Sequence, residues 1–194
     1  NSENPVICVP SGNFGNICAG ILAHHRGLPV EHFIAACNVN DVVPEYLRTE
    51  ILKPKETVAT ISNAMDVGDP SNFVRILELF EKEFNQVKNK LSGYTIDDEE
   101  TLKTIERVEK DYGYVLDPHG AVAFVALEKY LAENGGKGFF LETAHPVKFP
   151  DSVEKATGKS VEIPKSLEEL MRQEKFTTEI NPQYEELKEF LLKK

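Results

Sequence analysis

The sequence lacks tryptophan, and it holds only two methionines and three cysteines in 194 residues. No apolar stretch approaches the ~20 residues that an α-helix needs to span a bilayer, so we expect no membrane-spanning helix. The first ten residues also lack the basic segment with which a signal peptide begins. We therefore expect a cytoplasmic protein without a membrane partner.

An excess of basic residues is also absent. The chain has 22 Lys and Arg against 32 Asp and Glu, which gives a formal net charge of −10, and no run of basic residues occurs. Because nucleic acids are polyanions, this balance argues against a nucleic-acid partner. An anionic ligand would need a local binding site within this acidic protein.

Disulfide and metal motifs are missing as well. Cys8, Cys18 and Cys37 are odd in number, widely spaced and without a CxxC pair. This disfavours a disulfide framework or a zinc knuckle and favours buried, reduced thiols. The five histidines form no HExxH motif, and no carboxylate stands with them at metal-ligand spacing. We expect no metal site.

What is present is an alternation of strand-like and helix-like segments. The stretch "VICV" at residues 6–9 precedes a turn rich in glycine and asparagine, and a helix follows before Gly27. Further strands are expected at residues 32–41, 57–62 and 138–143, and further helices at residues 73–84, 97–111 and 119–136, with two terminal helices after residue 163. The order predicts an α/β fold with a mainly parallel, twisted sheet covered by helices on both faces. We divide the chain into a domain at residues 1–164 and a helical extension at residues 165–194.

Polar segments follow several of the predicted strands. In parallel α/β sheets, ligands bind beyond the carboxyl ends of the strands. We therefore expect one common rim to carry residues 11–16, 38–41, 63–72 and 143–148.

The turn "SGNFGN" at residues 11–16 is suited to an anion. The first N–H groups of the following helix have no partner within the helix, and the helix dipole adds partial positive charge there. Gly12 and Gly15 allow positive φ angles and a close approach of the backbone, while Ser11, Asn13 and Asn16 offer side-chain donors. This combination of groups favours a phosphate.

Other interpretations of the turn stay open at this point. Gly, Asn and Ser are common turn residues, and they can satisfy the local backbone and cap the helix without any ligand. The turn is neither GxGxxG, because residue 14 is Phe, nor a P-loop, because no Lys follows. Asp41, at the end of the second strand, keeps a dinucleotide site possible.

Five separated motifs closely resemble threonine synthase, in the same order. They are "SGNFGN" at residues 11–16, "NVNDVVPEYL" at 38–47, "TISNAMDVGDPSNF" at 60–73, "DPHGAVA" at 117–123 and "ETAHPVKFP" at 142–150. The resemblance runs from about residue 6 to residue 164. It implies a fold-type II pyridoxal-phosphate enzyme that converts O-phosphohomoserine and water to threonine and inorganic phosphate.

The resemblance also implies roles for particular residues. The cofactor's 5′-phosphate would be bound by the backbone of Gly12, Asn13, Phe14, Gly15 and Asn16. Thr143 would place a neutral hydroxyl at the pyridine nitrogen and so temper the ring as an electron sink; its alternative role is to cap a strand end.

Four further residues lie in family motifs on the same predicted rim, namely Ser71, Asn72, His145 and Lys148. Lys148 would pair with a phosphate or carboxylate of the substrate, or else be a surface lysine. His119 and His145 have a simpler alternative, in which they only cap or pack.

The family's Schiff-base lysine, on a motif resembling "FKD", is absent from this sequence. Lys53, Lys55 and Lys148 stand in other contexts. Because the sequence also begins without Met and close to a strand, we expect the C-terminal part of a longer threonine synthase, with the missing N-terminal part as its partner. The isolated chain is expected not to turn over O-phosphohomoserine. The alternatives are a segment of a serine/threonine dehydratase-like or cysteine synthase-like enzyme and a non-catalytic phosphate-binding module.

Overall fold

The computed structural model describes residues 4–174 and 176–193, and the chain divides into two compact units, Asn1–Val161 and Glu162–Lys194. The strands of the first unit are β1 (Val6–Pro10), β2 (His32–Cys37), β3 (Leu91–Thr95) and β4 (Gly138–Phe140). Its α-helices are α1 (Gly15–His25), α2 (Val42–Thr49), α3 (Phe73–Leu79), α4 (Phe84–Lys90), α5 (Asp98–Tyr112), α6 (Pro118–Asn134) and α7 (Pro150–Thr157). Short 3-10 helices lie at η1 (Asn63–Met65) and η2 (Pro146–Lys148), and the second unit holds α8 (Lys165–Met171) and α9 (Tyr184–Leu192).

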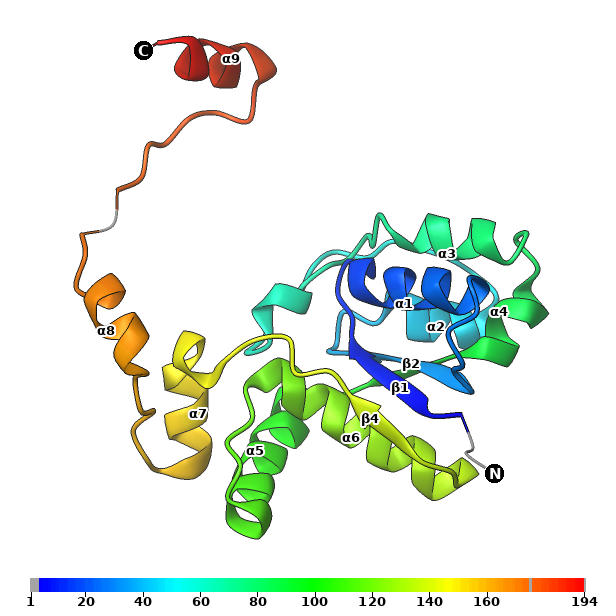
Figure 1. Cartoon of the computed structure of the whole chain (residues 1–194). Coiled ribbons are helices and arrows are strands. Elements are labelled where there is room, and N and C mark those ends of the chain that lie inside the picture. Colours follow the sequence, from blue (N-terminus) through cyan, green and yellow to red (C-terminus); the bar gives the residue numbers. More distant parts are fainter. Residues whose placement is uncertain (1–3, 175, 194) are drawn as a thin grey trace. The chain divides into compact units, whose positions relative to one another are not determined.

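The strands form one sheet in the order β3-β2-β1-β4, and every neighbouring pair is parallel. In this register Val6 lies opposite His32 on one side and Gly138 on the other. Helices α1 to α4 lie on one face of the sheet, and α6, backed by α5, lies on the other (Figure 1). The predicted α/β fold with a parallel sheet covered on both faces is confirmed.

The side chains of the two central strands alternate between two buried clusters, as the period of a β-strand requires. One cluster joins residues of α1 to α4 to Val9, Phe33, Ala35 and Cys37. The other joins residues of α6 to Val6, Cys8, Ile34 and Ala36. Because both faces are covered, these strands are apolar except for His32 at the start of β2, which is why the sequence identified them.

The predicted strand at residues 57–62 is wrong. This segment is a loop that is exposed in its first half and buried at its end, and side chains take backbone donors in it. The N–H of Val58 donates to Asn40 Oδ1 at 2.8 Å, and that of Thr60 donates to Asp66 Oδ2 at 3.0 Å. Donors engaged in this way cannot form a strand ladder. The sheet instead takes β3, which the sequence did not predict because "LSGYT" has no apolar run.

Other boundaries also differ from the prediction. The helix expected at residues 73–84 is broken, since Glu81 and Lys82 have positive φ angles of 53° and 61° between α3 and α4. The reversal lets Phe80 and Phe84 both pack against the first cluster. Strand β4 ends at Phe140, three residues earlier than expected, and α2, α4 and α7 were not predicted. The helix expected at residues 97–111 is confirmed as α5, and Asp97 caps it, because Asp97 Oδ1 accepts from the N–H of Glu100 at 2.8 Å.

The second unit contains the two predicted terminal helices, α8 and α9. On α9, the apolar side chains of Leu187, Phe190 and Leu191 are exposed.

Candidate functional site

The turn after β1 is anchored to β2 at its first residue. The N–H of Ser11 donates to the carbonyl of Ala36 at 2.8 Å, and the thiol of Cys37 donates to the carbonyl of Ser11 at 3.3 Å. The Ser11 hydroxyl is turned inward and donates to the carbonyl of Val9 at 2.8 Å. Ser11 therefore fixes the start of the turn, and its hydroxyl is not the outward donor that we expected. All three cysteines are free thiols.

The positive φ angle in the turn belongs to Phe14, at 62°, and not to Gly12 or Gly15 as expected. The Phe14 side chain is 3% exposed and packs edge-on against Phe73 with ring centroids 5.6 Å apart. Burial of this ring stabilises a backbone conformation that is strained for a residue other than glycine. Phe14 thus holds the turn in shape from beneath.

Gly12 is required by a close contact with η1. A Cβ atom at this position would lie 2.6 Å from the Cα of Met65 and 3.1 Å from the carbonyl oxygen of Ala64. At Gly15 the nearest atom to such a Cβ is Nδ2 of Asn72, at 3.6 Å, which is an ordinary contact. The absence of a side chain at Gly12 therefore lets η1 close one side of the turn.

The backbone donors of the turn face no protein acceptor. Among the described residues, none accepts a hydrogen bond from the N–H groups of residues 12–17. Helix α1 has no acidic residue in its first turn, and no side chain caps it at Phe14. Asn13, Gly15 and Asn16 are exposed. The N-terminus of an 11-residue helix whose first donors have no partner among the described residues is a site that fits a phosphate group.

Of the other predicted rim residues, Ser71 and Asn72 lie beside this turn. Asn13 Oδ1 accepts from the N–H of Ser71 at 2.7 Å and from its hydroxyl at 3.0 Å. Asn72 approaches Gly15, as described above. The start of α3 is thereby tied to the turn, so residues 71 and 72 are available to a ligand bound there.

The segment after β4 carries Thr143, His145 and Lys148. Thr143 lies three residues beyond the carboxyl end of β4, which is parallel to β1, so it follows the same edge of the sheet from which the turn at residues 11–16 leaves. Thr143 is exposed. His145 caps η2, since its Nδ1 accepts from the N–H of Val147 at 3.2 Å, and Lys148 is exposed at the end of η2.

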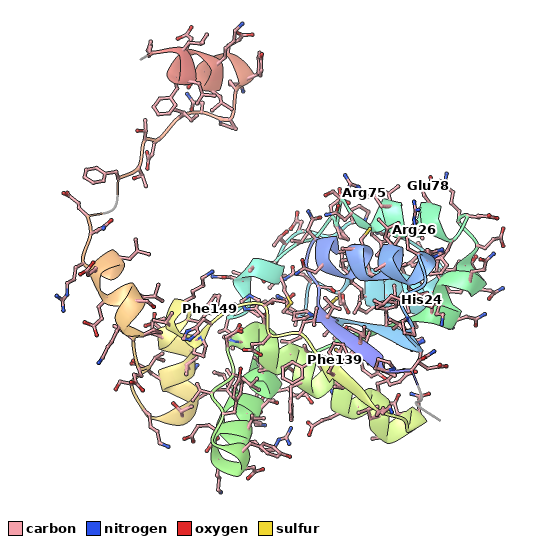
Figure 2. The ribbon with its side chains drawn as sticks, in the orientation of Figure 1. His24, Arg26, Arg75, Glu78, Phe139 and Phe149 are labelled. Atoms are coloured by element: carbon pink, nitrogen blue, oxygen red, sulfur yellow. The ribbon has the colours of Figure 1, made fainter. Side chains whose placement is uncertain are left out.

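A buried polar cluster beside this segment was not recognised from the sequence. Asp117 is fully buried at the N-cap of α6, and His119 is 2% exposed. The His119 ring lies between Asp117, with Nδ1 2.6 Å from Oδ1, and η1, where Nε2 accepts from the N–H of Ala64 at 3.2 Å. Phe149, labelled in Figure 2, covers the ring at a centroid distance of 4.7 Å. Glu142 completes the cluster, with Oε1 accepting from the N–H of Asp117 at 3.2 Å.

The loop after β2 is polar but closed on itself. The Asn38 amide donates to Asp66 Oδ1 at 2.8 Å and to the Thr60 hydroxyl at 2.9 Å. Asp41, which kept a dinucleotide site possible, is paired with Lys55 at 2.6 Å and accepts from the Thr95 hydroxyl at 3.0 Å. These groups satisfy one another, and they brace the loop that leads to η1.

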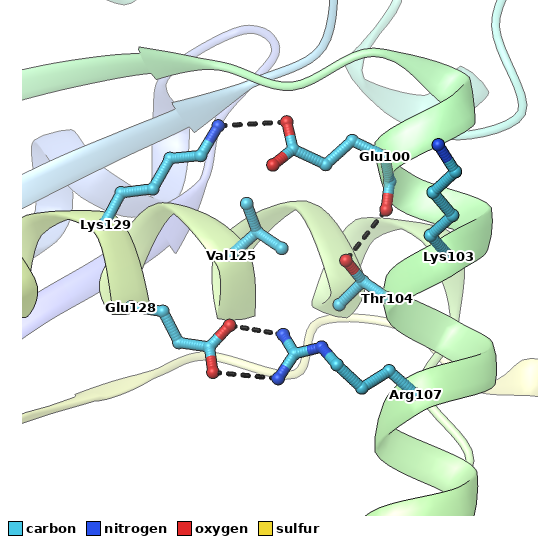
Figure 3. Close-up of a pocket in the computed structure, with 7 residues that line it drawn as sticks. All are labelled: Glu100, Lys103, Thr104, Arg107, Val125, Glu128 and Lys129. Atoms are coloured by element: carbon cyan, nitrogen blue, oxygen red, sulfur yellow. Dashed lines mark hydrogen bonds and ion pairs between the residues drawn. The ribbon is translucent and has the colours of Figure 1, made fainter.

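A hollow of about 370 Å³ lies elsewhere, between α5 and α6 (Figure 3). Its charged groups already pair across it, since Arg107 binds Glu128 and Lys129 binds Glu100 at 2.9 Å. Its remaining lining residues, Lys103, Thr104 and Val125, lie on the same two helices. The hollow is therefore separate from the turn and adds nothing to the site.

No helix in the described part of the chain is long and apolar enough to cross a membrane. Within the same residues, no group of three or more His, Cys, Asp or Glu side chains is arranged so that it could hold a metal ion.

Comparison with protein families gives two matches. Residues 2–139 match the family described as "Pyridoxal-phosphate dependent enzyme", and residues 120–191 match "Threonine synthase, C-terminal". The first match contains the turn and the second contains the segment after β4.

Comparison with individual proteins points to the same enzymes. The chain is 45% identical to the threonine synthase of Buchnera aphidicola subsp. Schizaphis graminum over 194 residues, which is 99% of this chain and 44% of that protein. The crystal structure of threonine synthase from Escherichia coli matches with a TM-score of 0.88 and 43% identity, over 97% of this chain and 44% of that one. The structure of PLP-bound threonine synthase from Brucella melitensis matches with a TM-score of 0.84 and 30% identity, over 97% and 46%. The resemblance to threonine synthase is confirmed, and the chain spans less than half the length of these relatives.

Proposed function

The chain belongs to the family of pyridoxal-phosphate-dependent enzymes, and we propose that it is the C-terminal portion of a threonine synthase. The proposed reaction converts O-phosphohomoserine and water to threonine and inorganic phosphate. A cytoplasmic location and the division at residues 164 and 165, into a cofactor-phosphate-binding domain and a helical extension, belong to the same proposal.

One observation carries the proposal. The turn at residues 11–16 presents free N–H groups at the start of α1, and η1 closes against Gly12. Because a phosphate accepts hydrogen bonds from several such groups and is favoured by the helix dipole, this turn suits the 5′-phosphate of pyridoxal phosphate. We assign that phosphate to the backbone of Gly12, Asn13, Phe14, Gly15 and Asn16.

Other residues of the rim would then face the rest of the ligand. When bound, pyridoxal phosphate supplies an electron sink for the substrate's Cα and Cβ chemistry. We assign Thr143 to the pyridine nitrogen, where a hydroxyl adds no charge. Ser71, Asn72 and Lys148 are candidates for the substrate's carboxylate and phosphate, and Lys148 would act there as a point charge.

We place the lysine that binds the cofactor covalently in the part of the enzyme that precedes this segment in its relatives. Lys55 is engaged in ion pairs with Asp41 and Glu45. Lys53 lies in the exposed loop after α2. We therefore expect no phosphate release from O-phosphohomoserine by the 194-residue chain alone.

The binding part of the proposal can be tested on this chain with pyridoxine 5′-phosphate, which lacks the aldehyde and so does not react with surface lysines. Asn16→Asp places a negative charge at the start of α1. The new charge favours the helix dipole but repels the phosphate, so we expect thermal stability to be kept and affinity to fall about tenfold or more. Calorimetric titration measures the affinity.

A matched control is Asn85→Asp, which makes the same change in the exposed first turn of α4. This variant should bind like the unmodified chain. Equal loss of affinity in both variants, or none in Asn16→Asp, would contradict the assignment of the phosphate to the turn.

The reaction is tested with a chimera in which this chain replaces the matching C-terminal part of the Escherichia coli relative. We expect the chimera to release phosphate from O-phosphohomoserine and to support growth of a strain that lacks threonine synthase. A chimera that binds the cofactor but acts only on serine or threonine would favour a dehydratase instead. One that binds the cofactor and catalyses neither reaction would favour a non-catalytic module.

A further inference from the structure

Three ionisable residues from two distant segments meet in the interior. Asp117 and His119 stand at the start of α6, and Glu142 lies two residues beyond β4. The approach is so close that a Cβ atom at Gly120 would overlap the carboxyl group of Glu142. A glycine at this position is therefore needed to admit the carboxyl group to the start of the helix.

The partners of His119 fix the position of its proton. Since the backbone N–H of Ala64 can only donate, Nε2 of His119 must accept and is unprotonated. Nδ1 then carries the proton and donates to Asp117 Oδ1 at 2.6 Å. His119 is thus a neutral bridge from η1 to Asp117.

The two carboxyl groups complement each other. Asp117 Oδ2 and Glu142 Oε2 are both buried, and neither has a hydrogen-bond partner among the described residues. Burial first, and then the hydrogen bond and charge of Asp117, raise the pKa of Glu142 to about 8. Burial alone would raise the pKa of Asp117 as well, but hydrogen bonds from His119 and Glu142 bring it below its usual range. A single proton on Glu142, donated to Asp117, gives both oxygen atoms a partner.

This cluster connects the two parts of the proposed cofactor site. On one side it holds Ala64 of η1, the segment that closes against Gly12. On the other side it holds Glu142, which is bonded through the backbone to Thr143. We propose that His119, Asp117 and Glu142 form one relay of hydrogen bonds that positions the phosphate-binding turn and Thr143 relative to each other. The proposal rests on the proposed function, because it takes both as cofactor contacts.

The relay depends on a protonated Glu142, and the groups that face Glu142 supply no positive charge. They are Asp117 at the N-cap of α6, to which His119 is hydrogen-bonded, and Tyr114 on the preceding loop, whose pKa is raised by burial and by the charges of Glu142 and Asp117. No ion pair joins Glu142 to a Lys or Arg in the described part of the chain. Loss of the proton above about pH 8 would place two like charges side by side.

The first test is thermal stability against pH. The pKa of Glu142 is raised from 4.5 in the unfolded chain to about 8 in the folded one. The contribution of its proton to the free energy of unfolding is therefore complete below the unfolded pKa of 4.5 and is lost as pH rises through about 8. The amide of Glu142→Gln keeps a donor for Asp117 Oδ2 and an acceptor for the backbone N–H of Asp117, but it does not ionise. Between pH 6.5 and pH 9 the unmodified chain should lose at least about 3 °C more in melting temperature than this variant does.

The matched control is Glu128→Gln, on α6, where Glu128 forms a partly exposed ion pair with Arg107. It should follow the unmodified chain across the whole range. If Glu142→Gln also follows the unmodified chain, the shared proton is absent and the relay is refuted. These measurements need no ligand, so they stand even if the proposed cofactor site is wrong.

The second test asks whether the relay positions the site. At pH 6.5, Glu142→Gln should bind pyridoxine 5′-phosphate within about twofold of the unmodified chain, and Glu142→Ala should lose about fivefold or more. At pH 9 the unmodified chain should bind more weakly than Glu142→Gln. Because both are measured at the same pH, any titration of the ligand affects them equally.

Should Glu142→Ala fail to fold, the comparison at pH 9 is sufficient to test the positioning role. Equal affinity of the chain and Glu142→Gln at pH 9 would overturn the positioning role. Failure of the unmodified chain to bind the probe at any pH would instead refute the proposed cofactor site and the positioning role that depends on it.

Discussion

The loops that follow β1 and β2 leave the same edge of the sheet, yet they use their hydrogen-bond donors in opposite ways. After β1, the N–H groups of residues 12–17 have no acceptor among the residues that the structure describes. After β2, the buried amide groups of Asn38 and Asn40 are bonded to Asp66 and to the segment at residues 58–62. Both loops are rich in asparagine, so composition does not distinguish them.

The difference indicates what each loop is for. Buried polar groups that satisfy one another stabilise a conformation and leave nothing for a ligand. Donors at a helix start that have no acceptor in the protein are available to an anion. We infer that the β2 loop is the structural support and that the β1 turn is the binding element, with η1 lying between them.

The largest effect on stability is expected in the β2 loop. Asn38 is 1% exposed, and Asn38→Ala would leave the N–H of Asn40 without its acceptor and would remove one of the donors to the carboxylate of Asp66. Removing one member of such a buried network should lower the free energy of unfolding by about 3 kcal/mol. Urea unfolding measures the change.

The control is Asn63→Ala, in the same loop region but exposed. It should change stability by less than about 0.5 kcal/mol. If Asn38→Ala is as mild as this control, the β2 loop does not support the fold and the contrast between the two loops fails.

A smaller loss of stability is expected where η1 contacts Gly12 of the β1 turn. In Gly12→Ala, the added Cβ would lie 2.6 Å from the Cα of Met65, so η1 must move. Such overpacking typically costs about 1–3 kcal/mol, and displacement of η1 should also abolish binding of pyridoxine 5′-phosphate. Thermal melting and calorimetric titration measure the two effects.

Gly15→Ala is the matched control for this substitution, because its Cβ meets only an ordinary contact at 3.6 Å. It should leave stability unchanged or raise it by up to about 1 kcal/mol, since alanine is the better helix former. A Gly12→Ala chain that melts and binds like Gly15→Ala would show that η1 does not close the turn.

The sequence predicted the elements whose residues carry a local signal. Strands β1 and β2 are buried on both faces and read as apolar runs, and the spacing of Leu102, Ile105 and Val108 predicted the helix that the structure has as α5. The turn at residues 11–16 was recognised because its glycines and asparagines are adjacent in sequence. Its conformation was not, since Gly12 is needed for a contact with a residue 53 positions away, and Phe14 takes the positive φ angle because a distant core accepts its ring.

Features that arise only from tertiary contacts were missed. Residues 57–62 look like a strand, but Asn40 and Asp66 take the donors that a ladder would need. Strand β3 has polar residues because its pairing with β2, not its own hydrophobicity, places it in the sheet. Glu142 stood in a recognised motif, but its role was missed, because that role depends on Asp117, 25 residues earlier, and on a glycine that admits its carboxyl group.

The smallest effect tests whether exposure, and not residue type, separates the two loops. Asn13, like Asn38, accepts hydrogen bonds from its neighbours, and both of its bonds come from Ser71. Unlike Asn38, however, Asn13 and its partner Ser71 are exposed. In Asn13→Ala, water can replace the lost acceptor, so the free energy of unfolding should fall by only about 0.5–1 kcal/mol. A double-mutant cycle with Ser71→Ala isolates the bond to the hydroxyl, and we expect a coupling of about 0.5 kcal/mol. Were Asn13→Ala as costly as Asn38→Ala, the β1 turn would depend on its side chains for folding as much as the β2 loop does. Its free donors would then be a by-product of that structure and no longer evidence for a ligand.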